Sequence, residues 1–442
     1  MQHNPIIVAP ATALGGAIAV LRMSGEGSVA LCDRIFKGRK PLVEAKSHTI
    51  HYGTICDDER VVDDVVVAIF RAPHSYTGEE SVEISIHGSR YIAQEVIRLL
   101  CEQGAQMAMA GEFSQRALAA GRIDLSQAEA VADLIASDSR AAHAVAATQM
   151  RGGYSEILEG LRDKLLNITT LLELELDFSE EDVEFADRAK LRSMLEKTDS
   201  AVVRLMESFK VGNAIREGVA VAIVGRPNVG KSTLLNRLVG DDRAMVSDIA
   251  GTTRDTIEES VVIDDIRFRF VDTAGLHDTD DRLEQMGIER TERAMRQAQI
   301  VLYMMEPSQV EFELPTLGSE QTLLLVVNKI DTSSERSVEG AIYISAREGE
   351  GIDELRNALR STVDTEGLYR GEVVVSNMRH FEALSRAHSA LTAAVSALDM
   401  GVSEELLAED IRSAITALAE ITGRITSDDI LKNVFANFCI GK

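Results

Sequence analysis

The sequence predicts a multidomain α/β and all-α protein in which a doubly wound α/β domain interrupts a helical domain. Apolar strand-like runs alternate with helical segments over residues 217–367, as in "VAVAIVG", "IRFRFVDTAG" and "TLLLVVNK". This alternation is typical of a parallel sheet covered by helices. Helical periodicity flanks this region on both sides, whereas residues 1–120 mix short strands with loops and predict an α+β domain. The predicted boundaries are 1–120, 121–216, 217–367 and 368–442, with the second and fourth segments forming the helical domain.

Local patterns support each of the other elements. "DDVVVAIFRAP" and "SVEISIHGS" are rich in apolar and β-branched residues and predict strands. "SQAEAVADLI" predicts a helix that begins at Ser126, with Glu129 completing a capping box. "SDDILKNVFANF" predicts a short helix capped by Ser427. Two buried helix faces are predicted from apolar spacing, one formed by Leu407, Ile411, Ile415, Leu418 and Ile421 and the other by Ile430, Leu431, Val434, Phe435 and Phe438.

Composition and charge exclude several classes of protein. Of the 442 residues, 45% are hydrophobic and 26% are charged, as in ordinary soluble proteins. The formal net charge of −25 argues against broad, non-specific binding of nucleic acid, so any RNA contact needs local basic patches or a partner. No apolar run is long enough to span a bilayer, and the N-terminus lacks the features of a signal peptide. The four cysteines, Cys32, Cys56, Cys101 and Cys439, lie far apart without a CxxC pair, which favours free thiols in a reducing cytoplasm. Cys32, Cys56 and Cys101 are expected to be buried.

The segment "GRPNVGKST" is a phosphate-binding loop, because it follows the strand "VAVAIV" and precedes the helical "LLNRLVG". Gly225 and Gly230 allow the backbone to turn its N–H groups toward phosphate oxygens, and the helix N-terminus adds partial positive charge. Lys231 is expected to reach the β- and γ-phosphates, and the Ser232 hydroxyl to bind Mg²⁺. Asn228 offers a side-chain oxygen to a monovalent cation.

Three further motifs indicate that the nucleotide is GTP. "DTAG" ends a predicted strand, where Asp272 is suited to bind Mg²⁺ through water and Gly275 to sense the γ-phosphate. "NKID" follows the strand "TLLLVV", and a carboxylate at Asp331 accepts hydrogen bonds from both the ring N–H and the 2-amino group of guanine. Adenine offers neither donor, and a site built for such bonds can reject the analogue by about 10⁴–10⁵. "SAR" at Ser345–Arg347 is expected to support the base through its backbone.

The switch regions lack the usual water-orienting glutamine. The position after "DTAG" is Leu276, which cannot orient a water by hydrogen bonding, so hydrolysis needs another route. "VSDIAGTTRD" lies in the expected first switch, where Thr253 can complete the Mg²⁺ shell. The residues predicted to contact GTP are Asn228, Val229, Gly230, Lys231, Ser232, Thr233, Ser247, Asp248, Ile249, Ala250, Gly251, Thr252, Thr253, Asp272, Thr273, Ala274, Gly275, Asn328, Lys329, Asp331, Ser345, Ala346 and Arg347.

Taken together, these motifs resemble the tRNA uridine-modification GTPases of the MnmE (TrmE) family over essentially the whole chain. The most specific matches are "GEFSQRALAAGRIDLSQAEAVADLI" and the terminal "CIGK". The resemblance implies an N-terminal folate-binding and dimerisation domain, a helical domain, and an inserted Ras-like P-loop G domain. It also implies a cytoplasmic homodimer that works with a flavoprotein (FAD) partner of the MnmG/GidA family, as a heterotetramer, on the wobble uridine of certain tRNAs. The product would carry an aminomethyl or carboxymethylaminomethyl group at C5.

For the G domain, the resemblance implies a GTP hydrolase that is activated when two G domains meet in the presence of K⁺. The K⁺ would be bound by Asn228, Ser247, Ile249 and Thr252, and Mg²⁺ by Ser232 and Thr253. A positive charge at this place can be worth about 10³–10⁵ in rate. Glu284 in "RLEQMGIER" matches the glutamate of the family that orients the attacking water indirectly.

For the N-terminal domain, the resemblance implies a site for a tetrahydrofolate one-carbon donor, bound in its 5-formyl form in known complexes. Arg22, Glu79 and Arg122 match the folate contacts, although the family commonly has Lys at the third position and the two cations differ in shape. Lys442 would contribute a further contact. "HGS" at His87–Ser89 departs from the usual double glycine, and His87 is expected to be an ordinary loop histidine.

The chain end raises two interpretations of Cys439. The predicted helix before it would anchor the tail and bring Cys439 near the folate pocket, where a catalytic thiol needs a thiolate-favouring environment. A purely structural cysteine is the alternative.

Two other functions fit parts of the sequence. One is a ribosome-assembly or stress-sensing GTPase switch, which would not need the N-terminal half or "CIGK". The other is a folate-binding regulatory module with a vestigial GTPase, against which the intact GTP motifs argue.

Overall fold

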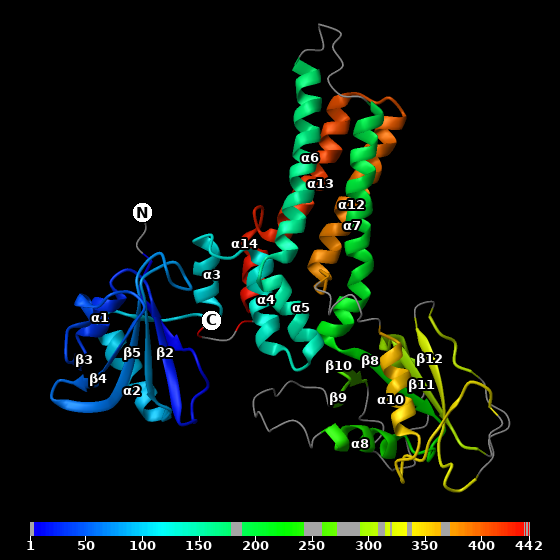
Figure 1. The fold of residues 1–442 in the computed structure, drawn as a ribbon, viewed down its shortest axis with the longest axis horizontal. Helices are drawn as coiled ribbons and strands as arrows, with labels where there is room; N and C mark the ends of the chain where they lie inside the picture. Colours follow the sequence, from blue (N-terminus) through cyan, green and yellow to red (C-terminus); the bar gives the residue numbers. More distant parts are fainter. Residues whose placement is uncertain are drawn as a thin grey trace. The chain divides into compact units, whose positions relative to one another are not determined.

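The computed structural model describes residues 4–177, 188–242, 259–271, 292–307, 314–318, 321–333, 338–363, 372–436, 438 and 441 (Figure 1). The chain divides into two compact units. The first combines Met1–Ala132 with Leu418–Lys442, and the second is Asp133–Ala417. The first and last parts of the sequence therefore fold together.

The first unit contains a seven-stranded sheet of order β3-β4-β5-β6-β2-β1-β7. Neighbouring strands are antiparallel except β1 and β7, which are parallel. The two predicted strands are confirmed as β5 and β6. The strands are β1 (Ile7–Pro10), β2 (Ile18–Ser24), β3 (Phe36–Gly38), β4 (Thr49–Asp57), β5 (Arg60–Phe70), β6 (Ser81–His87) and β7 (Gln106–Met107).

Helices α1 (Ser28–Asp33) and α2 (Arg90–Glu102) pack against this sheet. Alternate strand residues such as Val67 and Ile84 are fully buried in the core that they share with Val96 of α2. A short 3₁₀ helix, η1 (Leu42–Glu44), joins the same core through Leu42.

The C-terminal helix α14 (Asp428–Ala436) belongs to this unit, as do α3 (Glu112–Ala119) and the start of α4 (Leu125–Ala136). Phe435 and Phe438 are buried against Leu125. The predicted cap at Ser427 is confirmed, because its Oγ accepts a hydrogen bond from the Ile430 amide at 3.4 Å. Ile430, Leu431 and Val434 complete the predicted face as half-buried neighbours.

The predicted capping box of α4 is wrong by two residues. Asp124 caps the helix, because its Oδ1 accepts from the Gln127 amide at 2.8 Å while Gln127 Oε1 accepts from the Asp124 amide at 2.9 Å. This exchange is a capping box in which Asp and Gln replace Ser and Glu. Ser126 and Glu129 are instead buried inside the helix.

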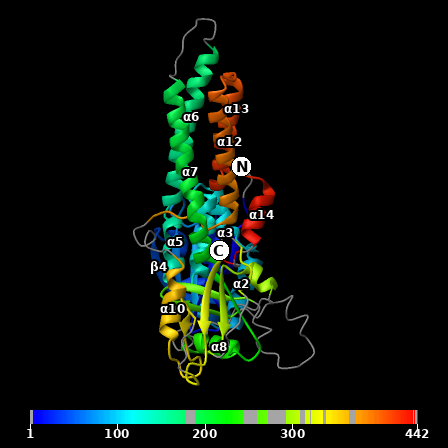
Figure 2. The same cartoon turned by 90° about the vertical axis from the view of Figure 1, so that its right-hand side faces the viewer.

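The second unit contains a bundle of long helices (Figures 1 and 2). Its members are α5 (Arg140–Met150), α6 (Gly153–Asp177), α7 (Arg188–Glu217), α12 (Met378–Asp399) and most of α13 (Glu404–Thr422), whose last residues from Leu418 belong to the first unit. Along α13, Leu407, Ile411, Leu418 and Ile421 are buried as predicted, whereas Ile415 is half-buried and Ala414 takes its place on the buried face.

The predicted α/β domain is confirmed as a six-stranded sheet of order β13-β12-β11-β8-β10-β9 in the same unit. All neighbours are parallel except the β9–β10 hairpin. Its elements are β8 (Val219–Gly225), α8 (Lys231–Asp242), β9 (Glu259–Ile263), β10 (Ile266–Phe270), β11 (Ile300–Met305), β12 (Thr322–Val327), β13 (Ile342–Tyr343) and α10 (Ile352–Ser361). Both faces of β8 are covered, because Val219 and Val221 lie in one core and Ala220 and Ala222 in another.

The β9–β10 hairpin contacts the N-terminus of α5. The backbone oxygen of Asp265 accepts from the Ala141 amide at 3.4 Å, and Arg267 of β10 pairs with Asp138 at 3.0 Å. Arg140 lies 3.8 Å from the Asp265 carboxylate. Asp264 and Asp265 both have left-handed backbones, with φ of 45° and 68°, as a two-residue hairpin turn requires.

Among the residues that the structure describes, every helix is too short or too polar to serve as a membrane span.

Candidate functional site

The phosphate-binding loop lies where the sequence predicts it, between the end of β8 at Gly225 and the start of α8 at Lys231. Its backbone is packed so closely that a Cβ at Gly225 would collide with the Met304 carbonyl and one at Gly230 with the Asn328 amide group. Gly230 also has a φ of 103°, which disfavours other residues. The loop is therefore a backbone cradle at a helix N-terminus, which suits an anion.

Lys231 lies over this cradle. Its Nζ donates to the carbonyls of Gly225 and Arg226 at 2.9 and 3.0 Å. Partial burial lowers the pKa of the Lys231 ammonium below its ordinary value. Ser232 and Thr233 occupy the first turn of α8 beside it. The loop thus brings a cation and two hydroxyls to one helix end.

Asn328 joins three of the predicted motifs. It is 3% exposed, and its Nδ2 donates to the Val229 carbonyl of the phosphate loop at 2.8 Å. Its Oδ1 accepts from the Ala346 amide at 2.9 Å. The side chain of Asn328 therefore bridges the phosphate-binding loop and the "SAR" segment.

The predicted guanine-recognition residues lie together at the ends of β12 and β13. Asp331 Oδ1 accepts from the Ser345 hydroxyl at 2.7 Å, which fixes the orientation of the carboxylate. Lys329 has a left-handed backbone with a φ of 69° and pairs with Glu306. Arg237 of α8 donates to the Ala346 carbonyl at 3.2 Å and also to that of Arg347.

Glu306 and Arg237 were missed by the sequence analysis. Neither belongs to a motif, and the only sequence signal is that Glu306 directly follows the buried strand β11. The other predicted G-domain residues lie outside the described part of the chain: Ser247, Asp248, Ile249, Ala250, Gly251, Thr252, Thr253, Asp272, Thr273, Ala274, Gly275, Leu276 and Glu284.

A second cluster in the first unit gathers the predicted residues Arg22, Glu79 and Arg122 around the loop between β5 and β6. Arg22 pairs with Glu83 at 2.8 Å and lies over the ring of Tyr76, with its guanidinium carbon 5.6 Å from the ring centroid. The Arg122 side chain packs against Gly78, the residue before Glu79.

Glu79 is tied to residues that the sequence analysis missed. Its Oε2 accepts from the Ser24 hydroxyl at 2.8 Å and from Arg116 at 3.0 Å. Arg116 lies within the "GEFSQRAL" block, but nothing in the sequence distinguishes its burial from that of other helical arginines. The predicted residues Cys439 and Lys442 lie outside the described residues.

The chain end nevertheless reaches β1. Gly441 is buried with a φ of 100°, and a Cβ there would collide with the Pro10 carbonyl. The tail is therefore anchored against the N-terminal strand, in the unit that contains the second cluster.

His87 and the described cysteines lie in surroundings that explain them as packing or hydrogen-bonding residues. His87 ends β6, and its Nδ1 lies 2.7 Å from Oδ1 of the buried Asp63. Ser89 caps α2 with an extended backbone and so needs no glycine. Cys32 and Cys56 are buried as predicted, whereas Cys101 is only half-buried. Burial, with a smaller effect of Asp33, raises the pKa of the Cys32 thiol to about 12.

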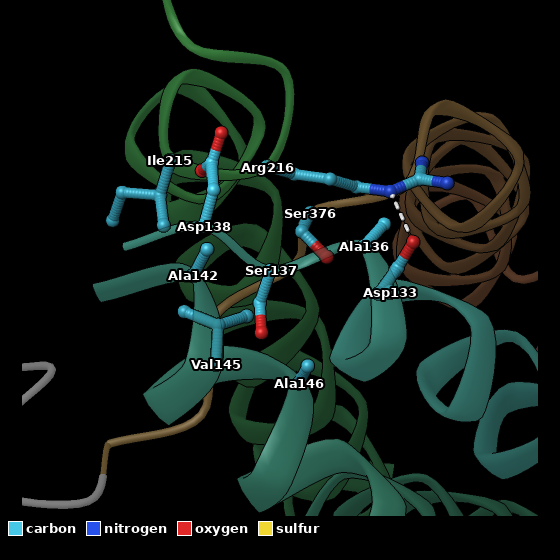
Figure 3. A pocket seen from close by; sticks show the side chains of 10 residues that line it. All are labelled: Asp133, Ala136, Ser137, Asp138, Ala142, Val145, Ala146, Ile215, Arg216 and Ser376. Carbon is cyan, nitrogen blue, oxygen red and sulfur yellow. Dashed lines mark hydrogen bonds and ion pairs between the residues drawn. The ribbon is translucent and has the colours of Figure 1, made fainter. Parts of the chain in front are cut away.

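A small cavity of about 40 Å³ lies beside the hairpin contact (Figure 3). Asp133, Asp138 and Ser376 line it, and Figure 3 shows Arg216 in its ion pair with Asp133, at 2.9 Å. This volume holds no more than a few waters, so the cavity is not a nucleotide site.

Comparison with known proteins shows the family of the chain. Residues 6–122 match the profile described as "GTP-binding protein TrmE N-terminus", and residues 125–439 match that of the "MnmE helical domain". Proteins named "tRNA modification GTPase MnmE" from Bacteroides thetaiotaomicron and Flavobacterium johnsoniae are each 47% identical to this chain, over 100% of both sequences. The protein of that name from Porphyromonas gingivalis is 46% identical over 100% of this chain and 98% of its own length. Profiles that together span almost all of the chain, and full-length relatives at this identity, show that the chain belongs to the MnmE (TrmE) family.

Proposed function

We propose that this protein is a GTP hydrolase that acts in tRNA modification. The observation that carries the proposal is the assembly of the phosphate loop, "NKID" and "SAR" around Asn328. Full-length relatives that are named tRNA modification GTPases support the same function.

In this proposal the protein's own residues bind and orient GTP. The loop amides and Lys231 bind the phosphates, and Asp331 accepts from guanine while Ser345 holds its carboxylate. The Ser232 hydroxyl, in the first turn of α8, is suitably placed in the chain for Mg²⁺, with Thr253 as the second ligand. Mg²⁺ supplies positive charge to the phosphate oxygens.

Hydrolysis in the proposal depends on K⁺ and on pairing of two G domains. Asn228 is a loop residue with a side-chain oxygen, and Ser247, Ile249 and Thr252 are assigned to the same ion. K⁺ supplies positive charge where an arginine acts in other GTPases. Glu284 orients the attacking water indirectly, which compensates for Leu276.

The K⁺ assignment is tested with Asn228→Ala. GTP turnover should lose its stimulation by K⁺ relative to Na⁺, while nucleotide affinity remains within about twofold because the loop amides are retained. Stimulation that persists in the variant would remove Asn228 from the cation site.

A reduced folate is the proposed one-carbon donor, bound by Arg22, Glu79, Arg122 and Lys442. A carboxylate and two guanidinium groups in one cluster match the donors of a 2-amino-4-oxopyrimidine ring and the carboxylates of a glutamate tail. The anchored end of the chain, with Gly441 against Pro10, supports a role of Cys439 near this cluster.

The proposed assembly is a cytoplasmic homodimer that forms a heterotetramer with a flavoprotein of the MnmG/GidA family. The product is an aminomethyl or carboxymethylaminomethyl group on C5 of the wobble uridine. Because the net charge is −25, contact with tRNA is expected to depend on local basic patches or on the partner.

The deciding experiment is a mass-spectrometric census of tRNA nucleosides from cells with and without this gene. Loss of an aminomethyl-type wobble uridine on deletion, restored by the wild-type gene, would support the proposal. An unchanged census would favour a GTPase switch without modification chemistry. Restoration by Cys439→Ser would reduce the terminal thiol to a packing residue.

A further inference from the structure

Glu79 forms an ion pair with an arginine, Arg116, whose side chain is almost completely buried. Arg116 on α3 has a side chain only 7% exposed, and its guanidinium donates to two carboxylates, Glu79 at 3.0 Å and Glu112 at 2.8 Å. Both carboxylates are about one-fifth exposed, at 22% and 21%. Burying such a group costs desolvation free energy, and apolar replacements are often as stable, so stability alone does not explain it.

The two terminal nitrogens of the Arg116 guanidinium group donate to different carboxylates. Glu112 also accepts from the Met109 amide at 2.9 Å, so it is fixed at the start of α3 and holds one side of the guanidinium. The other side is thereby directed at Glu79. The planar fork of arginine makes this orientation specific, which a lysine would not reproduce.

The same contacts leave one oxygen of Glu79 for a ligand. Arg116 and the buried Ser24 both donate to Oε2, which fills its two acceptor positions. Oε1 has a single long contact in the described structure, to the exposed Asn4 at 3.3 Å. The Ser24 hydroxyl is itself held by Thr77 at 2.7 Å, so the inner side of the carboxylate is rigid.

We infer that Arg116, supported by Glu112 and assisted by Ser24, is a positioning residue that presents Oε1 of Glu79 to the hydrogen-bond donors of a bound heterocycle. The ligand class is a ring with adjacent N–H and amino donors, as in the 2-amino-4-oxopyrimidine of a pterin. This inference rests on the proposed folate site, but it assigns specificity to a residue that does not touch the ligand.

The test measures discrimination between two ligands by calorimetry on the full-length protein. The probes are 5-formyltetrahydrofolate and its 2-desamino-2-methyl analogue, which lacks the amino donor. The wild type should prefer the first by about 10–100-fold, the range for a hydrogen bond to a charged group. Arg116→Met should reduce this preference to about threefold or less, because Glu79 is no longer held. Arg116→Lys should give an intermediate ratio.

A matched control is Arg98→Met, because Arg98 forms ion pairs in the same unit but is 41% exposed and lies on α2. Its preference should equal that of the wild type. If Arg116→Met does not fold, as judged by circular dichroism, Ser24→Ala removes the second donor to Oε2 and should lower the preference about threefold.

The outcomes separate the two proposals. Equal weakening of both ligands in Arg116→Met, with the ratio unchanged, would show a merely structural role and overturn the inference while leaving the folate site standing. A wild type that binds neither probe would overturn the folate proposal and the inference with it. A lost preference in Arg116→Met, with GTP turnover unchanged, supports both.

Discussion

At the scale of single residues, the GTP site depends on side chains that orient one another. Asn328 connects the phosphate loop to the "SAR" segment, and Ser345 holds the carboxylate of Asp331. Each of these hydrogen bonds joins residues that are at least 14 positions apart in the sequence. The carboxylate of Asp331, which is predicted to recognise the base, is therefore already oriented in this structure, and such preorganisation lowers the cost of binding.

Asp331→Asn should change the base preference from guanine to xanthine. The amide of asparagine keeps one acceptor oxygen and replaces the other with a donor NH₂ group, and xanthine offers a carbonyl where guanine has its amino group. GTP affinity should fall by about 10–100-fold, the range for the loss of a hydrogen bond to a charged group, while XTP turnover appears. Competition binding with GTP and XTP measures the change. An unaltered preference for GTP would contradict the guanine assignment.

Cys32 should resist alkylation across the neutral pH range. Burial raises the pKa of its thiol to about 12, so at pH 8 only about one molecule in 10⁴ carries the reactive thiolate. Raising the pH from 7 to 9 should therefore leave Cys32 essentially unlabelled in the folded protein, whereas in the denatured chain, where a cysteine has a pKa of about 8.5, the thiolate fraction rises from about 3% to about 75%.

Peptide mapping by mass spectrometry measures this labelling at each cysteine. Cys101 is the internal control, because it is half-buried and burial raises the pKa of its thiol to a smaller extent. Labelling of Cys32 before Cys101 in the native protein would contradict the described core.

At the scale of elements, helix ends show the limits of reading local patterns. Both Ser126–Glu129 and Asp124–Gln127 fit the spacing of a capping box, and the structure contains the second. Ser427 had no such competitor and was predicted correctly. Where two caps are possible, the one that leaves apolar Leu125 and Ala128 on the buried side is selected by packing.

Asp124→Ala should therefore destabilise the first turn of α4. Loss of an N-cap costs about 1 kcal/mol, which corresponds to about fivefold faster hydrogen exchange of the Gln127 amide. Exchange measured by mass spectrometry on peptides from this turn tests the prediction. Gln94→Ala, an exposed change within α2, should have no effect there. A larger effect of Glu129→Ala on the same amides would favour the capping box of Ser126 and Glu129 instead.

At the scale of the whole chain, the β9–β10 hairpin connects the G domain to the helical domain within the second unit. The contact consists of partly exposed charges and one backbone hydrogen bond, and each such ion pair is worth little on its own.

Charge exchange across this contact tests its ion pair. Asp138→Arg and Arg267→Asp should each weaken docking by about 0.5–1 kcal/mol, which increases exchange of the Ala141 amide about two- to fivefold. The double variant should restore slow exchange, because the pair is re-formed with opposite polarity. The control swaps the charges of Arg192 and Asp399, a comparable ion pair in the helical bundle, and should leave the hydrogen-exchange rate of the Ala141 amide unchanged.

Slow hydrogen exchange of the Ala141 amide in the double variant, with fast exchange in both single variants, would establish the ion pair between Asp138 and Arg267. Equal, additive effects of the two single changes would show that they act independently.

The sequence by itself determined the class of each region and the order of the GTP motifs. Strand and helix periodicity depend on residues two to four positions apart, and motif chemistry depends on residues within one loop. The parallel sheet, the buried face of α13 and the loop between β8 and α8 could therefore be predicted without coordinates.

Only the tertiary structure decided which distant side chains meet. Arg116 reaches Glu79 from 37 positions away and Asn328 reaches Val229 from 99, and no local pattern encodes either distance. The terminal helix packs on Leu125 because both bury apolar surface that neither could bury alone. Burial, and with it the charge state and orientation of a functional group, is a property of these long-range contacts.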